Sequence, residues 1–324
     1  MTVPLTDLIE SSDLNGLLRH VEVLVSGRDW PGMVEMRDRC LEAVERGKQL
    51  WGVAQFVEYR LALDAAPGFA GRVVREGAGR FTLGPLWEVA ASTHTWAELE
   101  SHVPDARLRA LVAAERVIRG DEVPPGEEDR TVLDVPLRLQ PWEPGYQVAA
   151  YRADKADFPA DLPPDLAWAE LPARPSRLDG IEGVDALLGL VQPWTEQSNG
   201  RAEAVAVEGS AAEAIRALGP HRVRLAAVPF PAALSAMAWT GASGGAYGRR
   251  RGTPVGRSLA WWALATLLGL EDGDPTPDEL GEEGPGLRWY LWDPGDRIGG
   301  WGFHLAVEDP VDRLAFAISA VDAL

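Results

Sequence analysis

The spacing of apolar residues changes once along the chain, and this change constrains the fold more than any other feature. Up to about residue 121 the apolar residues recur at helical spacing, as Leu14, Leu18 and Val21 illustrate. From about residue 183 short alternating runs are interspersed with helical ones. We therefore expect an α+β fold, in which an N-terminal all-helical array of hairpins precedes a small mixed α/β domain of about four strands.

Turn and capping signals divide the helical part into short elements. Ala65-Ala66-Pro67-Gly68 is a helix stop, and Thr95-Trp96-Ala97-Glu98 has the form of a capping box. Pro104 opens a further helix over Asp105–Arg119. No fixed sequence period relates these elements, so the array is not assigned to a named repeat.

A connector separates the two parts, so the expected divisions are 1–121, 122–180 and 181–324. Asp121–Asp134 contains six acidic residues and one arginine, which is typical of a solvated linker. Alternation over Thr131–Leu139 and Gln147–Arg152 predicts a possible pair of strands. Five prolines between residues 159 and 175 favour an irregular segment after it.

The C-terminal part is expected to alternate strands with helices. The strands are predicted at Ala202–Glu208, Arg222–Val228, Leu287–Trp292 and Gly302–Val307. The helices are predicted at Val184–Val191, Ala211–Leu218, Pro231–Thr240, Leu259–Leu270 and from Asp309-Pro310 to Ala320, with Glu271–Gly286 as a loop.

Charge is distributed very unevenly along this acidic chain. The formal net charge is −18, yet the 57 residues of Ala214–Leu270 contain seven arginines and no acidic residue. A charge of this sign argues against nucleic-acid binding over the whole surface. A local basic island is instead compatible with an acidic partner or a small anion.

Within that window, the segment from Ser243 to Arg257 is the most specific local pattern. Glycines permit close backbone approach, arginines form forked contacts with carboxylate or phosphate, and a helix start favours anions. The predicted binding residues are Arg249, Arg250, Arg251, Arg257, Gly244, Gly245 and Gly248. The segment lacks the Walker A sequence and does not follow a strand directly, so neither nucleotide fingerprint applies.

Three interpretations of this Gly-Arg loop stay open. The arginines neutralise the chain's own acidic segment Glu271–Glu283 or solvate a turn, they dock an acidic protein, or they cradle a nucleotide or another anion. The sequence favours an interaction or regulatory module that docks an acidic partner, with an anion-binding enzyme as the alternative. Self-association of the loop with Glu271–Glu283 of a second copy is a further expectation.

Patterns for catalysis and metal binding are weak. Gly241–Gly245 matches GxSxG and is followed by Asp293 or Asp296 and then His304, but a helical pattern precedes it where a nucleophile elbow needs a strand. The histidines lack metal-pair spacing and there is one cysteine, Cys40. We therefore predict no catalytic residue, metal site or cofactor. The odd spacing of Trp289 and Trp292 places them on opposite faces of a strand.

Two segments carry a resemblance to a known group. They are Trp239-Thr-Gly-Ala-Ser-Gly-Gly-Ala-Tyr-Gly-Arg-Arg-Arg-Gly, continued through Trp261-Trp262-Ala-Leu, and Leu83-Gly-Pro-Leu-Trp-Glu-Val-Ala-Ala-Ser. The chain resembles an uncharacterised actinobacterial protein family of unknown function. The resemblance implies no activity and brings no catalytic residues.

The compartment is inferred from absent signals. The first residues, MTVPLTDLIESSDL, have no basic and apolar regions of a signal peptide, and no apolar run reaches the length of a membrane span. The single cysteine excludes an intrachain disulfide framework. We therefore expect a soluble, cytoplasmic protein without a membrane partner.

Overall fold

The computed structural model divides the chain into two compact units. It describes residues 4–124, 132–161, 164–270, 273, 275–295 and 299–323. The described parts of 1–132 and 149–158 form the helical unit, and those of 133–148 and 159–324 form the α/β unit. The segment expected as a connector is thus shared between the two units. Among the described residues, no helix has the length and apolarity required to cross a membrane.

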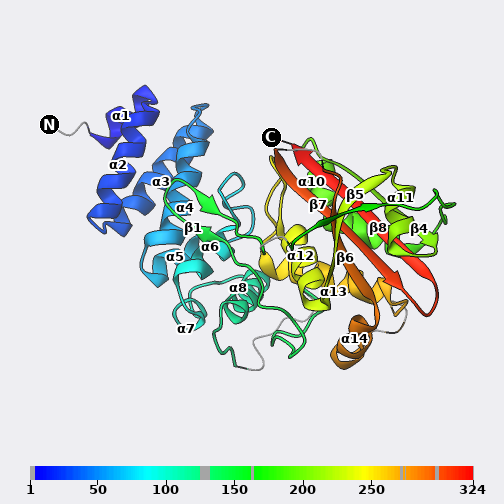
Figure 1. Cartoon of the computed structure of the whole chain (residues 1–324). Helices are drawn as coiled ribbons and strands as arrows, with labels where there is room; N and C mark the ends of the chain where they lie inside the picture. The colour runs from blue at the N-terminus through cyan, green and yellow to red at the C-terminus, as the bar shows by residue number, and fades with distance from the viewer. Residues whose placement is uncertain are drawn as a thin grey trace. The chain divides into compact units, whose positions relative to one another are not determined.

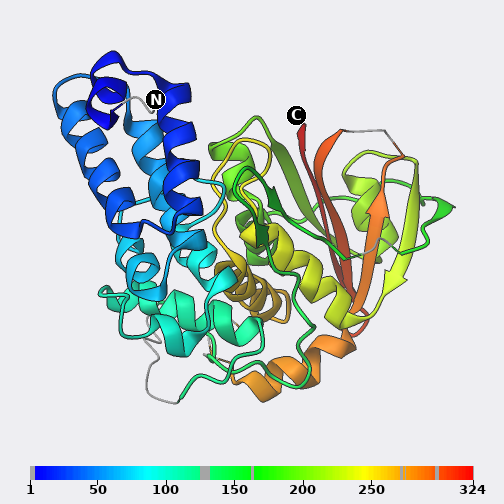
Figure 2. The same ribbon diagram turned by 90° about the vertical axis from the view of Figure 1, so that its left-hand side faces the viewer.

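The helical unit confirms the predicted N-terminal helices, and Figure 2 shows its longer helices side by side. The Thr95–Glu98 capping box is present, with both reciprocal bonds formed. The helices are α1 (Leu5–Ser11), α2 (Leu14–Ser26), α3 (Trp30–Glu45), α4 (Trp51–Asp64), α5 (Pro67–Val73), α6 (Leu86–Thr93), α7 (Trp96–Leu99) and α8 (Ala106–Ile118).

A short hairpin completes the helical unit. Its strands are β1 (Ala150–Tyr151) and β2 (Ala156–Asp157), which pair antiparallel. The Tyr151 hydroxyl donates to the buried Glu88 carboxylate at 2.7 Å, and Arg119 Nη2 donates to the Ala149 carbonyl at 2.7 Å. The predicted pairing of Thr131–Leu139 with Gln147–Arg152 is wrong, because the described residues 132–139 form turns and Tyr151 pairs with Ala156.

The α/β unit is built on one antiparallel sheet of six strands. Its order is β3-β5-β6-β7-β8-β4. The strands are β3 (Ala167–Glu170), β4 (Arg201–Glu208), β5 (Arg222–Val228), β6 (Arg288–Asp293), β7 (Gly300–Asp309) and β8 (Leu314–Ala323). The four predicted strands are all present, and β3 and β8 add two more.

Helices cover both faces of this sheet (Figure 1). On one face lie α9 (Glu182–Leu190), α12 (Phe230–Ala242) and α13 (Thr253–Leu267), while α11 (Ala211–Ala217) covers the other. Trp289 packs against Phe230 of α12, whereas Trp292 belongs to the core beneath α11. The predicted opposition of these two tryptophans is therefore confirmed.

Two C-terminal predictions are wrong. The segment expected as a last helix is β8, which forms a hairpin with β7. The Asp309 carboxylate accepts bonds from the backbone N–H groups of Val311 and Asp312, which turns the chain instead of capping a helix. Within the expected loop, α14 (Pro277–Glu283) and a 3₁₀ turn (Gly284–Gly286) form, because Thr276 and Glu279 make a capping box.

Close backbone contact sets the distance between α12 and α13. A Cβ atom on Gly256 would lie 2.1 Å from the Ala238 carbonyl oxygen and 2.6 Å from the Ala242 nitrogen. A Cβ atom on Gly241 would lie 3.2 Å from the Gly256 Cα. Only glycine at 256 lets these helices approach so closely.

We expect Gly256→Ala to lower the free energy of unfolding by roughly 1–3 kcal/mol, because α12 and α13 must move apart. Gly189→Ala is the matched control, since its Cβ would meet only the Trp262 ring at 3.5 Å. Urea unfolding followed by tryptophan fluorescence measures both. Equal stability of the two variants would contradict this account of the helix contact.

Candidate functional site

The Gly-Arg loop lies between α12 and α13, and its predicted glycines pack against their own chain. A Cβ atom on Gly244 would lie 2.3 Å from the Gly248 carbonyl oxygen, and one on Gly248 would lie 2.3 Å from the Gly244 oxygen. Gly245 has φ +72°, and a Cβ there would meet an oxygen of the buried Asp322. These glycines therefore shape a tight turn within the α/β unit.

Arg257 lies in α13, after the loop, and does not face solvent. It is 1 % exposed, and its Nε and Nη2 atoms each donate to the Glu143 carboxylate at 2.7 Å. Its Nη1 donates to the Pro136 carbonyl at 2.7 Å, and its guanidinium lies over the Trp261 ring. Arg257 thereby ties the segment around Glu143 to α13.

The Glu143 carboxylate is fully enclosed by this arrangement. Burial would raise the pKa of Glu143, but the hydrogen bonds and charge of Arg257, with further bonds from Tyr146 and Gln140, hold it below its usual value. Removing one partner of such a buried pair typically costs about 3–5 kcal/mol, because the other charge stays buried. Arg257 is therefore assigned to the architecture of the unit.

The other three arginines differ in their surroundings. Arg251 donates to the Gly189 carbonyl and to Gln192 Oε1, and burial lowers the pKa of its guanidinium. Arg250 Nη2 donates to the Thr253 hydroxyl at the start of α13. Arg249 is exposed, and its backbone N–H donates to Gln197. Since Thr253 and Pro254 are buried, the start of α13 is not an open anion cradle.

The sequence match to GxSxG lacks a nucleophile elbow. α12 is the element that precedes Ser243, and the buried Ser243 hydroxyl accepts a bond from the Gly245 N–H. A strained strand-to-helix turn is what exposes the serine in that motif. Asp296, one of the two candidate acids, lies outside the described residues.

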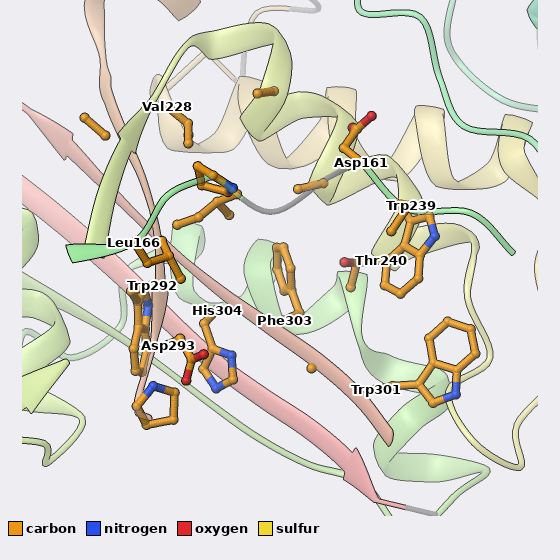
Figure 3. Close-up of a pocket in the computed structure, with 18 of the residues that line it drawn as sticks. Asp161, Leu166, Val228, Trp239, Thr240, Trp292, Asp293, Trp301, Phe303 and His304 are labelled. Atoms are coloured by element: carbon orange, nitrogen blue, oxygen red, sulfur yellow. The ribbon is translucent and has the colours of Figure 1, made fainter. Parts of the chain in front are cut away.

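A pocket of about 510 Å³ lies where α12 crosses the ends of the central strands (Figure 3). This size is in the range of small-molecule sites. α12 presents one face to it through Ala232, Ala236, Trp239 and Thr240, which follow the i, i+4, i+7, i+8 spacing of a helix face. The remaining lining comes from residues 160–161, Pro164, Leu166, 227–229, Leu291–Pro294, Trp301–His304 and Val321.

Several aromatic rings contribute to the lining. The rings of Trp239 and Trp301 stack with centroids 5.1 Å apart and an interplanar angle of 28°. Figure 3 shows the Phe303 ring rising from β7 toward the Thr240 hydroxyl, whereas His304 points to the other side of the strand, beside Asp293 and Trp292. Strand alternation accounts for the opposite directions of Phe303 and His304.

Several buried polar atoms of the lining make no hydrogen bond within the described part of the chain. They are Trp239 Nε1, Thr240 Oγ1, Trp292 Nε1 and His304 Nε2. An unsatisfied buried polar group costs about 1–3 kcal/mol. Of these, Trp239 and Thr240 lie on α12, whereas the side chains of Trp292 and His304 point to the opposite side of the sheet. Unsatisfied polar groups beside a cavity are typical of a binding site for a hydrogen-bonding ligand.

The two carboxylates of the lining already have partners. Asp161 accepts from Gln147 Nε2 at 2.9 Å. Asp293 pairs with Arg224 and accepts from the Gly295 N–H at 2.6 Å. Among the described lining residues there is no lysine or arginine. The pocket therefore offers aromatic surface and neutral polar groups, with negative charge as its only formal charge.

No motif in the sequence marks this pocket. Trp292 and His304 belong to other sequence patterns, and Trp239, Thr240, Trp301 and Phe303 were not among the predicted site residues. The four pocket-facing positions of α12 carry the one local signal. The helical spacing of these four positions is the same as that of residues that pack in a core, so the sequence of α12 alone does not distinguish a pocket from a core.

Comparison with known protein families identifies the family of this chain. A family model described as Family of unknown function (DUF6183) matches residues 15–323. The chain belongs to this family. The resemblance to a family of unknown function is thus confirmed, and it supplies no activity. No curated protein and no solved structure matches the chain.

His304 gives the pocket a pH-dependent signature. Burial lowers its pKa to about 4, although the nearby Asp293 carboxylate acts in the opposite direction. An unfolded histidine has a pKa near 6.5. Between these values the unfolded chain binds a proton that the folded chain does not, so stability falls as the pH falls from about 6.5 to about 4.

We expect His304→Gln to remove this contribution, which amounts to roughly 3 kcal/mol across that window. Urea unfolding at a series of pH values, compared with wild type, measures it. His221→Gln, at an exposed histidine of the same unit, is the control. A His304 imidazole that titrates near pH 6.5 by NMR would contradict the assignment.

Proposed function

We propose that the α/β unit binds a small organic ligand in the aromatic pocket beneath α12. The observation that carries the proposal is the buried, unpartnered Thr240 hydroxyl on the side of α12 that borders a cavity lined by Trp239, Trp301 and Phe303. An apolar cavity with a few unsatisfied polar groups is the usual form of a small-molecule site.

Binding accounts for this lining better than catalysis. The described lining residues include no serine, cysteine or lysine, and the carboxylates of Asp161 and Asp293 already have partners in their own chain. The neutral His304 imidazole lies on the opposite side of β7 from Phe303. The pocket is therefore suited to hold a ligand, as in a sensor or regulatory module.

We expect Ala236→Phe to abolish ligand binding, because the added ring fills the cavity from α12. The measurement is a screen of ring-containing fragments by ligand-observed NMR, with each hit then titrated against the variant. Ala167→Phe is the control, since Ala167 is exposed on β3 and outside the lining. An empty screen on wild type, or hits that survive Ala236→Phe, would reject the pocket as the binding site.

A second proposal concerns the tip of the Gly-Arg loop. We propose that Tyr247 and Arg249 dock an acidic protein, which retains the interaction role expected from the sequence. Tyr247 is 61 % exposed and Arg249 is also exposed. Their backbone N–H groups donate to Ser198 and Gln197, so the tip is held in place. Tyrosine and arginine are residue types that dominate binding energy at interfaces.

The alternative of an anion cradle at the same loop has less support, because Arg251 and Arg257 are engaged by their own chain and the start of α13 is buried. Self-association through the loop, like docking of an acidic protein, depends on attraction between the basic loop and acidic groups, so added salt weakens both.

We expect Arg249→Glu to abolish capture of acidic partners and to remove any salt-sensitive self-association. Affinity capture with mass spectrometry and light scattering, both at low and high salt, measure these outcomes. Arg288→Glu, in a surface pair with Glu308, is the control for unspecific charge effects. Partners retained equally by wild type and Arg249→Glu would exclude docking through this tip.

A further inference from the structure

The charges and donors around the pocket restrict what can bind there. Among the described lining residues the only formal charges are the carboxylates of Asp161 and Asp293, and the whole chain carries −18. A buried anion needs a cation or several donors to compensate for lost hydration. An anionic ligand is therefore disfavoured. The Arg224 guanidinium that neutralises Asp293 is already paired.

The Thr240 hydroxyl indicates which hydrogen bond a ligand of this pocket has to make. It is 0 % exposed and makes no hydrogen bond, although a threonine in a helix commonly donates to the carbonyl four residues earlier. Thr266 of α13 does form that bond, to the Trp262 carbonyl at 3.0 Å. The hydroxyl of Thr240 thus has no acceptor in its own helix, and it lies on the side of α12 that borders the cavity (Figure 3).

The unpartnered group beside Thr240 on α12 is a donor. The indole N–H of Trp239 donates only, and it lacks an acceptor. A ligand that satisfies the lining must therefore present acceptor atoms. An ammonium group presents none, so a cation satisfies the charge of the lining but leaves its donors unpaired.

The rings define the rest of the ligand. Trp301 and Phe303 come from β7 and Trp239 from α12, so aromatic surfaces of two elements border the cavity. Aromatic faces favour stacking or edge contacts with planar rings. The apolar part of the ligand is expected to be a ring system instead of a flexible chain.

We propose that the pocket takes an uncharged ring compound whose carbonyl or ether oxygen accepts a hydrogen bond from Thr240. This inference rests on the proposed ligand-binding function and adds the ligand class to it. The oxygen lies at the Thr240 side of the cavity, and the ring lies among Trp239, Trp301 and Phe303.

Three matched probes test the ligand class. Indole-3-acetamide, tryptamine and indole-3-acetate share one ring and carry, respectively, no charge, a positive charge and a negative charge. Isothermal titration is expected to show that the amide binds tightest and the carboxylate at least about tenfold more weakly. Tightest binding by tryptamine or by indole-3-acetate overturns the proposal.

Thr240→Val tests the hydrogen bond. We expect it to weaken amide binding about fivefold, the equivalent of a typical hydrogen bond. We also expect it to raise the stability of the free protein, because a buried unsatisfied hydroxyl is removed. Thr266→Val is the control and should leave amide affinity unchanged, since that hydroxyl serves its own helix. Unchanged amide affinity in Thr240→Val overturns the hydrogen bond.

The proposal and the function beneath it fail in different ways. If the fragment screen on wild type finds no ligand and the indole probes do not bind, the ligand-binding function itself fails. If fragments bind and Ala236→Phe blocks them, but anions are preferred, the function stands and the ligand class is wrong.

Discussion

The α/β unit depends on the placement of α12 between a neighbouring helix and the sheet. On one side, Ala238, Gly241 and Ala242 approach Gly256 of α13 so closely that no side chain fits there. On the other side, the helix faces the strands, and Trp289 packs against Phe230 near its start. Packing on both sides fixes the helix, and the pocket is the part of its sheet-facing side that remains unfilled.

The same geometry explains the long acid-free window from residue 214 to 270. Much of that window is buried in α11, α12 and α13, where carboxylates would be costly. Arg257 is the exception that is both charged and buried, and Glu143, from a segment more than a hundred residues earlier, neutralises it. The basic island is therefore partly a consequence of packing, and its exposed remainder is centred on Tyr247 and Arg249.

Local signals predicted most of the helices and four strands, because periodicity and caps act over a few residues. These signals failed where the same local hydrogen bonds are compatible with two different secondary structures. Asp309 accepts backbone bonds in the same way whether it caps a helix or turns a hairpin, and the pairing of β7 with β8 decides between them. β3 was not predicted because its stability comes from pairing with β5, and its own four residues are too few to give a strand signal.

The sequence alone did not predict the pocket, for a related reason. Its lining is contributed by α12, by β6 and β7 some fifty residues later, and by a proline-rich segment some seventy residues earlier. Each contribution reads locally as core. Glycines and arginines, by contrast, form a recognisable pattern in the sequence, and this pattern predicted a binding loop. In the structure its glycines shape a tight turn, and Arg257 pairs with the buried Glu143.

The most direct test of the account is a crystal structure of the α/β unit within the full chain, examined at Thr240. We predict an open cavity between α12 and the strands, with the Thr240 hydroxyl bonded only to an ordered water or an organic molecule. A cavity closed by Trp301 and Phe303, with the Thr240 hydroxyl donating to the Ala236 carbonyl, would contradict the central claim.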